Sequence, residues 1–94
     1  MLTTPLAFAQ TPWQIDHPGR TQILTRADHL DQRIAYKQSI GVIRPRRAAA
    51  LQRQVARVRW EQNTMASRNG GHLVRPQWQV LNRKEDAISR EIGQ

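Results

Sequence analysis

The sequence contains no cysteine, and only 5% of its residues are aromatic. The absence of thiols excludes disulfides, thiolate metal sites and cysteine nucleophiles. No apolar run reaches the length of a transmembrane helix. A hydrophobic core must therefore be built from Leu, Ile, Val and Ala, and 94 residues are enough for one small domain with a modest core.

Acidic residues are also scarce, because seven Asp and Glu stand against fifteen Lys and Arg, for a formal net charge of +8. Residues 41–60 contain no acid and six arginines, which are Arg44, Arg46, Arg47, Arg53, Arg57 and Arg59. Such a segment favours a polyanionic partner such as nucleic acid, anionic lipid or lipopolysaccharide. It is equally typical of a solvated face that keeps a small protein soluble.

The most informative feature present is an ungapped internal repeat with an offset of 30 residues, which carries Gly41 onto Gly71. Further matches are Ile43 with Leu73, Leu51 with Leu81, Arg53 with Arg83, Val58 with Ile88 and Glu61 with Glu91. Each copy predicts a glycine turn that leads into an amphipathic helix.

Residues 1–19 contain Pro5, Pro12, Pro18 and Gly19 without sustained periodicity, which predicts an irregular arm. Ala7-Phe8-Ala9 has the form of a signal-peptidase site, so the start resembles the tail of a secretory signal. The alternative is an ordinary flexible N-terminus. Trp13 is the expected anchor of this arm.

Residues 20–94 predict a single all-α domain of three amphipathic helices, at about 21–38, 45–65 and 75–92. The residues predicted to form its core are Leu30, Ile34, Leu51, Val55, Val58, Leu81 and Ile88. The expected N-caps of the second and third helices, Arg44 and Arg75, cannot cap with a side-chain oxygen. Ile43 and Leu73 occupy equivalent turns and are expected to lie side by side, as paired loops do in EF-hand-like helix-loop-helix geometry.

A calcium loop built on these glycines lacks its ligands. The ligand positions hold Tyr36, Gln38, Ile40 and Arg47 around Gly41, and Ala66, Arg68, Gly70 and Gln77 around Gly71. None of them offers a carboxylate, so the geometry excludes calcium binding of this type.

The turns Gly41-Val42-Ile43-Arg44 and Gly71-His72-Leu73-Val74 and the ending Leu81–Ile92 resemble a family of small basic exported proteins of proteobacteria. That family carries repeated Gly-x-Leu-Thr-x-x-Glu turns, each followed by an amphipathic helix. This chain departs from the pattern at the Thr (Arg44, Val74) and at the Glu (Arg47, Gln77). The resemblance implies an exported helical protein and assigns no catalytic residue.

On a helical wheel, Arg46, Arg53, Arg57 and Trp60 fall opposite the apolar stripe of the second helix. A guanidinium group can donate two hydrogen bonds to one phosphate, and an adjacent indole offers a stacking surface. These four residues are therefore the candidate anion-binding site. The alternatives are a local cation-π pair of Trp60 with Arg57, and Trp60 packed under the arm.

Catalytic and metal sites find little support in the sequence. His17, His29 and His72 have no helical ligand spacing, and Asp28, His29 and Asp31 do not converge on one face. Glu85 falls inside an apolar stripe, where a salt bridge or a hydrogen bond to Gln62 or an arginine is expected.

The sequence as a whole predicts a small, basic, non-enzymatic helical protein without a cofactor, which is periplasmic or secreted and binds through its arginine face. The expected partner is an anionic envelope polymer or lipid surface, or a protein. The alternatives are a nucleic-acid-binding module, which would place the chain in the cytoplasm, and a purely structural domain.

Calcium at millimolar concentration should leave the melting temperature and the helical circular dichroism unchanged, because the loop positions lack carboxylates. A rise of several degrees in the melting temperature would overturn this prediction.

Overall fold

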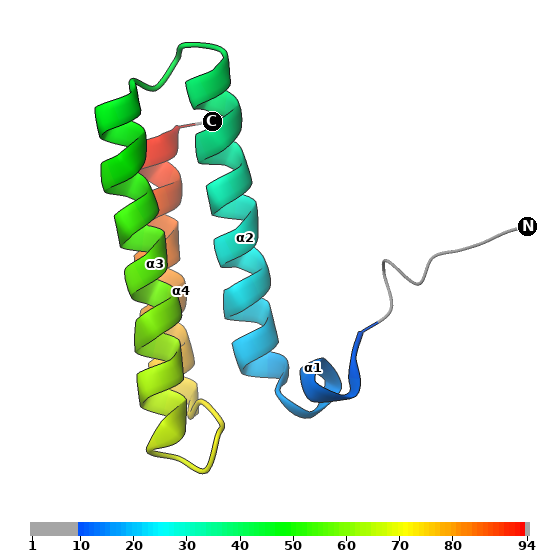
Figure 1. The fold of residues 1–94 in the computed structure, drawn as a ribbon. Helices are drawn as coiled ribbons and strands as arrows, with labels where there is room; N and C mark the ends of the chain where they lie inside the picture. Colours follow the sequence, from blue (N-terminus) through cyan, green and yellow to red (C-terminus); the bar gives the residue numbers. More distant parts are fainter. Residues whose placement is uncertain (1–9, 94) are drawn as a thin grey trace, which may run out of the picture.

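The computed structural model describes residues 10–93, which form four helices. These are α1 (Pro12–Asp16), α2 (Pro18–Ser39), α3 (Pro45–Ser67) and α4 (Arg75–Ile92). Helices α2, α3 and α4 pack side by side, with α2 and α4 running in one direction and α3 in the other (Figure 1). The all-α prediction is confirmed. The signal-like segment, residues 1–9, lies outside the described residues.

The core lies between the three long helices, each of which buries the stripe predicted from its periodicity. Its members are Ile23, Ala27, Leu30, Ile34, Ile43, Ala48, Leu51, Val55, Val58, Leu81, Ile88 and Ile92. The seven core residues predicted from the sequence are all among them. Met65, Leu73 and Trp78 are partly buried against this cluster. Between residues 10 and 93, no helix combines the length and the apolar character that crossing a bilayer requires.

The prediction that residues 1–19 form an irregular arm is wrong for the residues of this segment that the structure describes, because they include a helix and the start of another. Thr11 and Gln14 form a reciprocal capping box that starts α1, with the Thr11 N–H donating to Gln14 Oε1 at 2.8 Å and the Gln14 N–H to Thr11 Oγ1 at 3.1 Å. Pro12 and Pro18 occupy the first turns of α1 and α2, where a proline lacks no needed hydrogen bond. These prolines start helices, and α2 begins at Pro18 rather than near Thr21.

The two glycine turns lie at opposite ends of the bundle, so the expected pairing of Ile43 with Leu73 in an EF-hand-like arrangement is wrong (Figure 1). Between them runs α3, whose 23 residues span roughly 34 Å. Gly41 and Gly71 each have a positive φ, at +78° and +94°, which an L side chain rarely adopts. Equivalent turns in a repeat therefore end up far apart, because each one reverses the chain.

The first turn of α4 is capped by a glutamine. The N-cap residue is Val74 rather than Arg75, and its N–H donates to Gln77 Oε1 at 3.1 Å. The same Gln77 oxygen accepts from Asn69 Nδ2 at 3.1 Å and so links the turn to the helix. Val74 has no side-chain oxygen to cap the helix, so only one half of a capping box is present, the bond from the N-cap N–H to the Gln77 side chain.

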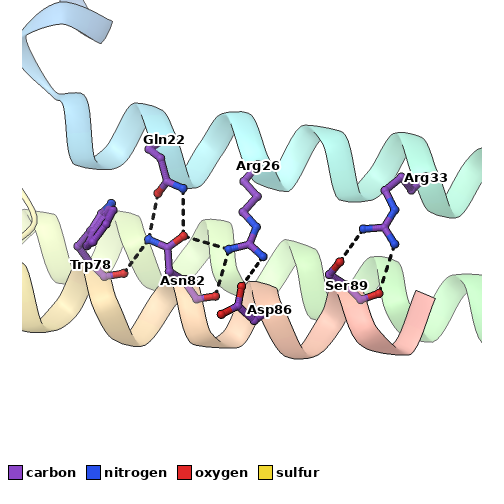
Figure 2. A network of polar contacts seen from close by, with 7 residues as sticks. All are labelled: Gln22, Arg26, Arg33, Trp78, Asn82, Asp86 and Ser89. Carbon is purple, nitrogen blue, oxygen red and sulfur yellow. Dashed lines mark hydrogen bonds and ion pairs between the residues drawn. The ribbon is translucent and has the colours of Figure 1, made fainter. Parts of the chain in front are cut away.

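A ladder of polar contacts joins α2 to α4 along their length (Figure 2). Gln22 and Asn82 exchange two amide hydrogen bonds, both at 3.0 Å. Arg26 donates to the Asn82 side chain at 3.1 Å and forms an ion pair with Asp86. Closer to the C-terminal ends of both helices, Arg33 Nη1 donates to Ser89 Oγ at 2.7 Å. These contacts set the register of two parallel neighbouring helices.

The C-terminal end of α4 is held by cations from α2. Arg33 donates to the carbonyl oxygens of Ser89 and Gly93, and Lys37 Nζ donates to that of Ile92 at 3.3 Å. The last carbonyls of a helix have no partner within the helix and carry partial negative charge. Arg33 and Lys37 therefore cap α4 from the neighbouring helix.

Truncation of a core leucine should destabilise the domain strongly. Leu51 and Leu81 are fully buried, so Leu51→Ala or Leu81→Ala should lower the free energy of unfolding by roughly 2–5 kcal/mol. Urea denaturation measures this loss. Leu24→Ala, at a partly exposed position, is the matched control and should lose less. A core variant that melts within about two degrees of the parent would contradict the core assignment.

Candidate anion-binding site

The Lys and Arg side chains fall into two groups according to what they contact. The bridging group links different helices or turns through hydrogen bonds and ion pairs, and consists of Arg20, Arg26, Arg33, Lys37, Arg47, Arg59 and Lys84. The unpaired group makes no side-chain hydrogen bond or ion pair within residues 10–93, and consists of Arg44, Arg46, Arg53, Arg57, Arg68, Arg75, Arg83 and Arg90.

Acidic side chains pair with the bridging group. Arg59 on α3 contacts both Asp28 at 2.8 Å and Asp31 at 2.7 Å on α2. Lys84 on α4 lies 2.8 and 2.9 Å from the two oxygens of Glu61 on α3. The other pairs are Arg26 with Asp86 and Arg47 with Glu91. Within the described chain, the charges of the unpaired group therefore stay uncompensated.

The four predicted site residues form one exposed stripe along α3. Arg46, Arg53, Arg57 and Trp60 are all exposed, and they follow one another at steps of seven, four and three residues. These steps return to nearly the same side of a helix. From Arg46 to Trp60 the stripe extends roughly 21 Å along the axis. We call these four residues the arginine stripe.

Arg53 and Arg57 both line two hollows in the surface. The first is a groove of about 460 Å³ between α3 and α4, with Val58, Ala87 and Ile88 among its lining residues. The second is a shallow depression lined by Arg53, Ala56, Arg57, Trp60 and Glu61. Lys84 also lines the groove, but Glu61 neutralises it. The positive charge beside both hollows thus comes from Arg53 and Arg57.

Trp60 presents its indole to solvent. Its exposed fraction is 64%, so the alternative in which it packs under the N-terminal arm is wrong for the described part of that arm. The cation-π contact found within residues 10–93 joins Arg20 to Trp13, with 5.0 Å between the guanidinium carbon and the ring centroid. The exposed ring of Trp60 next to Arg57 leaves a face open for a stacking ligand.

The sequence did not reveal an aromatic cluster where α1 meets the α3–α4 turn. Trp13 stacks on His17 at 4.3 Å, and His17 stacks on His72 at 4.6 Å, between ring centroids. Trp13 therefore does anchor its segment, whereas Ile15 is 61% exposed. The two imidazole planes differ by only 12°. A metal held by both would have to lie in each ring plane, so this arrangement serves packing.

Among the described residues, no group of three His, Asp or Glu could hold a metal ion. Asp28 and Asp31 both pair with Arg59, and His29 is exposed.

Glu85 differs from the five acids that pair with the bridging group. It is fully buried, and neither of its carboxyl oxygens has a hydrogen-bond partner, so the expected bond to Gln62 or an arginine is wrong. Those groups are engaged elsewhere: Gln62 accepts from Arg20 at 2.8 Å, and Arg59 pairs with aspartates. Burial raises the pKa of Glu85 to about 8, and Arg26 partly opposes the rise.

Comparison of the chain with known protein families, with characterised proteins and with solved structures gives no match.

Glu85 should make the stability of the domain depend on pH. The unfolded chain ionises this carboxyl near pH 4.5 and the folded chain near pH 8, so only the unfolded state loses the proton between these values. Stability should fall as pH rises through this window, by at most about 5 kcal/mol, and then level off. Urea denaturation at pH 5 and pH 8.5 measures the free energy of unfolding of the parent and of Glu85→Gln. The value for the variant, relative to that for the parent, should be higher at pH 8.5 than at pH 5.

Glu91→Gln provides the matched control, because Glu91 is exposed and paired with Arg47. The difference in free energy of unfolding between this variant and the parent should change little over the same pH range. A Glu85→Gln difference that is the same at both pH values would refute a neutral Glu85 carboxyl.

Proposed function

We propose that this chain is a non-enzymatic binding protein, and that its arginine stripe holds an anionic component of the cell envelope. The observation that carries the proposal is the charge separation just described. Arg46, Arg53 and Arg57 stay exposed and form no ion pair with an acidic side chain, while Asp28, Asp31 and other acids pair with the bridging group.

The shape of the stripe favours an extended ligand. The three guanidinium groups are spread along one side of α3 rather than gathered around a point, so a row of phosphates or sulfates fits them better than a single small ion. Each guanidinium can donate two parallel hydrogen bonds to a phosphate. A polymer or a lipid headgroup surface offers such repeated anionic groups.

The second candidate is a nucleic-acid-binding module, and the exposure of Trp60 favours it. An exposed indole beside Arg57 can stack on an unpaired base while the arginines follow the backbone. An acidic face of a protein partner could use the same charges. The envelope role also assumes export, which the pattern of residues 1–9 favours, whereas the nucleic-acid role requires the cytoplasm.

The decisive experiment removes the stripe without changing the core. In the variant Arg46→Gln, Arg53→Gln, Arg57→Gln the helical content should stay the same, because all three side chains are exposed. Binding to heparin, lipopolysaccharide or single-stranded DNA should weaken, and the dependence of affinity on salt should flatten by about one contact per arginine removed. Fluorescence titrations at several salt concentrations measure both effects.

The matched control is Arg68→Gln, Arg75→Gln, Arg83→Gln, which removes the same charge at unpaired arginines outside the stripe. It should lose much less affinity. If both triple variants bind equally well, the stripe is a solvated surface and the domain is structural. Tighter binding to lipopolysaccharide than to DNA supports the envelope role, and the reverse order supports the second candidate.

The Trp60→Phe variant isolates the part played by the indole. The parent's fluorescence change on binding should be absent from this variant. Its affinity for single-stranded DNA should fall more than its affinity for heparin, because heparin offers no base to stack on.

A further inference from the structure

The end of the bundle formed by the α2–α3 turn exposes three large apolar side chains. Tyr36 is 63% exposed, Ile40 53% and Val42 63%. Tyr36 lies in the last turn of α2, and Ile40, the C-cap residue of this helix, donates its N–H to the Tyr36 carbonyl at 3.1 Å. The N–H of Val42 donates to the Lys37 carbonyl at 2.9 Å, which folds the turn back over the last turn of α2. These three residues, which we call the apolar tip, occupy the end of the bundle opposite to α1 (Figure 1).

Basic residues lie close to the apolar tip in the sequence. Residues 36–47 contain Lys37, Arg44, Arg46 and Arg47 and no acid. The acidic side chain placed nearby by α4 is Glu91, which accepts from Arg47 at 3.1 Å and from Gln54 at 3.4 Å. Arg44 and Arg46 are exposed and belong to the unpaired group. The apolar tip is therefore flanked by positively charged residues, which we call the positive collar and which are Lys37, Arg44, Arg46 and Arg47.

We propose that the apolar tip docks end-on into the surface of an anionic lipid bilayer. Ile40 and Val42 enter the boundary between headgroups and acyl chains, and Arg44 and Arg46 contact the lipid phosphates. Tyr36, one turn back along α2, lies at the headgroup level, where tyrosine is enriched in membrane proteins. Insertion over this boundary reaches about 5–10 Å, which one turn of helix and its loop can supply.

The combination of groups decides between possible occupants. A soluble polyanion such as heparin satisfies the arginines but offers no apolar layer for Ile40 and Val42. A second copy of the chain brings the same positive collar, and three partly exposed side chains fall well short of the roughly 800 Å² per partner of a stable interface. An anionic bilayer satisfies both the charge and the apolar side chains.

This inference goes beyond the proposed function, because it uses the end of the bundle and an apolar contact rather than the side of α3. Arg46 is common to both surfaces. The test therefore changes only apolar side chains and leaves every arginine in place.

The experiment measures co-sedimentation of the full chain with vesicles of phosphatidylglycerol and phosphatidylcholine, and with vesicles of phosphatidylcholine alone. The tip variant is Ile40→Ser, Val42→Ser. The control is Ile15→Ser, Val74→Ser, which makes the same two changes at exposed positions at the other end of the bundle. We expect the tip variant to bind anionic vesicles at least tenfold more weakly than the parent, and the control to stay within about twofold.

Two further measurements complete the test. Heparin affinity should be the same in the parent and the tip variant, since the arginine stripe is intact. Brominated acyl chains should quench the emission of Val42→Trp more strongly than that of the parent, because the new indole would lie among them.

The proposal is overturned if the tip variant binds anionic vesicles as well as the parent, or if the parent does not bind them. It is also overturned if sedimentation equilibrium shows a parent dimer that the tip variant dissociates, since the apolar tip would then be a self-association surface. Weaker vesicle binding with unchanged heparin binding in the tip variant, together with weaker heparin binding in the arginine stripe variant, would support both surfaces as proposed.

Discussion

The hydrogen bonds and ion pairs that basic side chains of α2 make to the other two long helices hold this small bundle in register. Arg20 reaches Gln62 and Asn63 on α3 and the carbonyl of Gly71 in the following turn. Arg26, Arg33 and Lys37 reach α4, and the last two also satisfy its terminal carbonyls. Apolar packing alone would tolerate sliding of one helix along another, whereas these directional contacts do not.

The pairing of acids with bridging cations on all three long helices shapes the surface of the rest of the molecule. These cations are Arg26 on α2, Arg47 and Arg59 on α3, and Lys84 on α4. The acids paired with bridging cations lie between helices, so little negative charge is left to offset the arginines on the outer side of α3 and on the α2–α3 turn. Exposed ion pairs contribute little to stability one by one. Their larger effect here is to leave positive charge concentrated on the arginine stripe and around the apolar tip, which the two proposals invoke.

Glu85 shows that the interior was not built for maximum stability. An apolar residue of similar size would pack there without the desolvation of a carboxyl group. The nearby charges of Arg26, Arg59 and Asp86 do not bond to it, and the domain holds a neutral acid at its centre near pH 7. Such a group makes the stability of the three-helix packing depend on pH between about 4.5 and 8.

Local patterns accounted for much of the fold. The period of apolar residues identified α2, α3, α4 and the core, because a helix in a bundle must bury one stripe. The side of α3 that carries Arg53 and Arg57 followed from the same geometry. Helix α1 was also readable from Thr11 and Gln14, but the prolines were interpreted as breakers rather than as first-turn residues.

The sequence by itself determined the helices, the buried stripes and the total charge, since these depend on residues within a few positions of one another. Only the tertiary structure decided which cations are bridging and which are unpaired. Arg59 and Arg57 look alike in the sequence, yet Arg59 meets Asp28 and Asp31 across the helix interface while Arg57 faces solvent. The unpaired state of Glu85 and the separation of the two turns were decided in the same way. The physical reason is that pairing depends on rotation and register between helices, and these are set by contacts among residues about 20 to 60 positions apart.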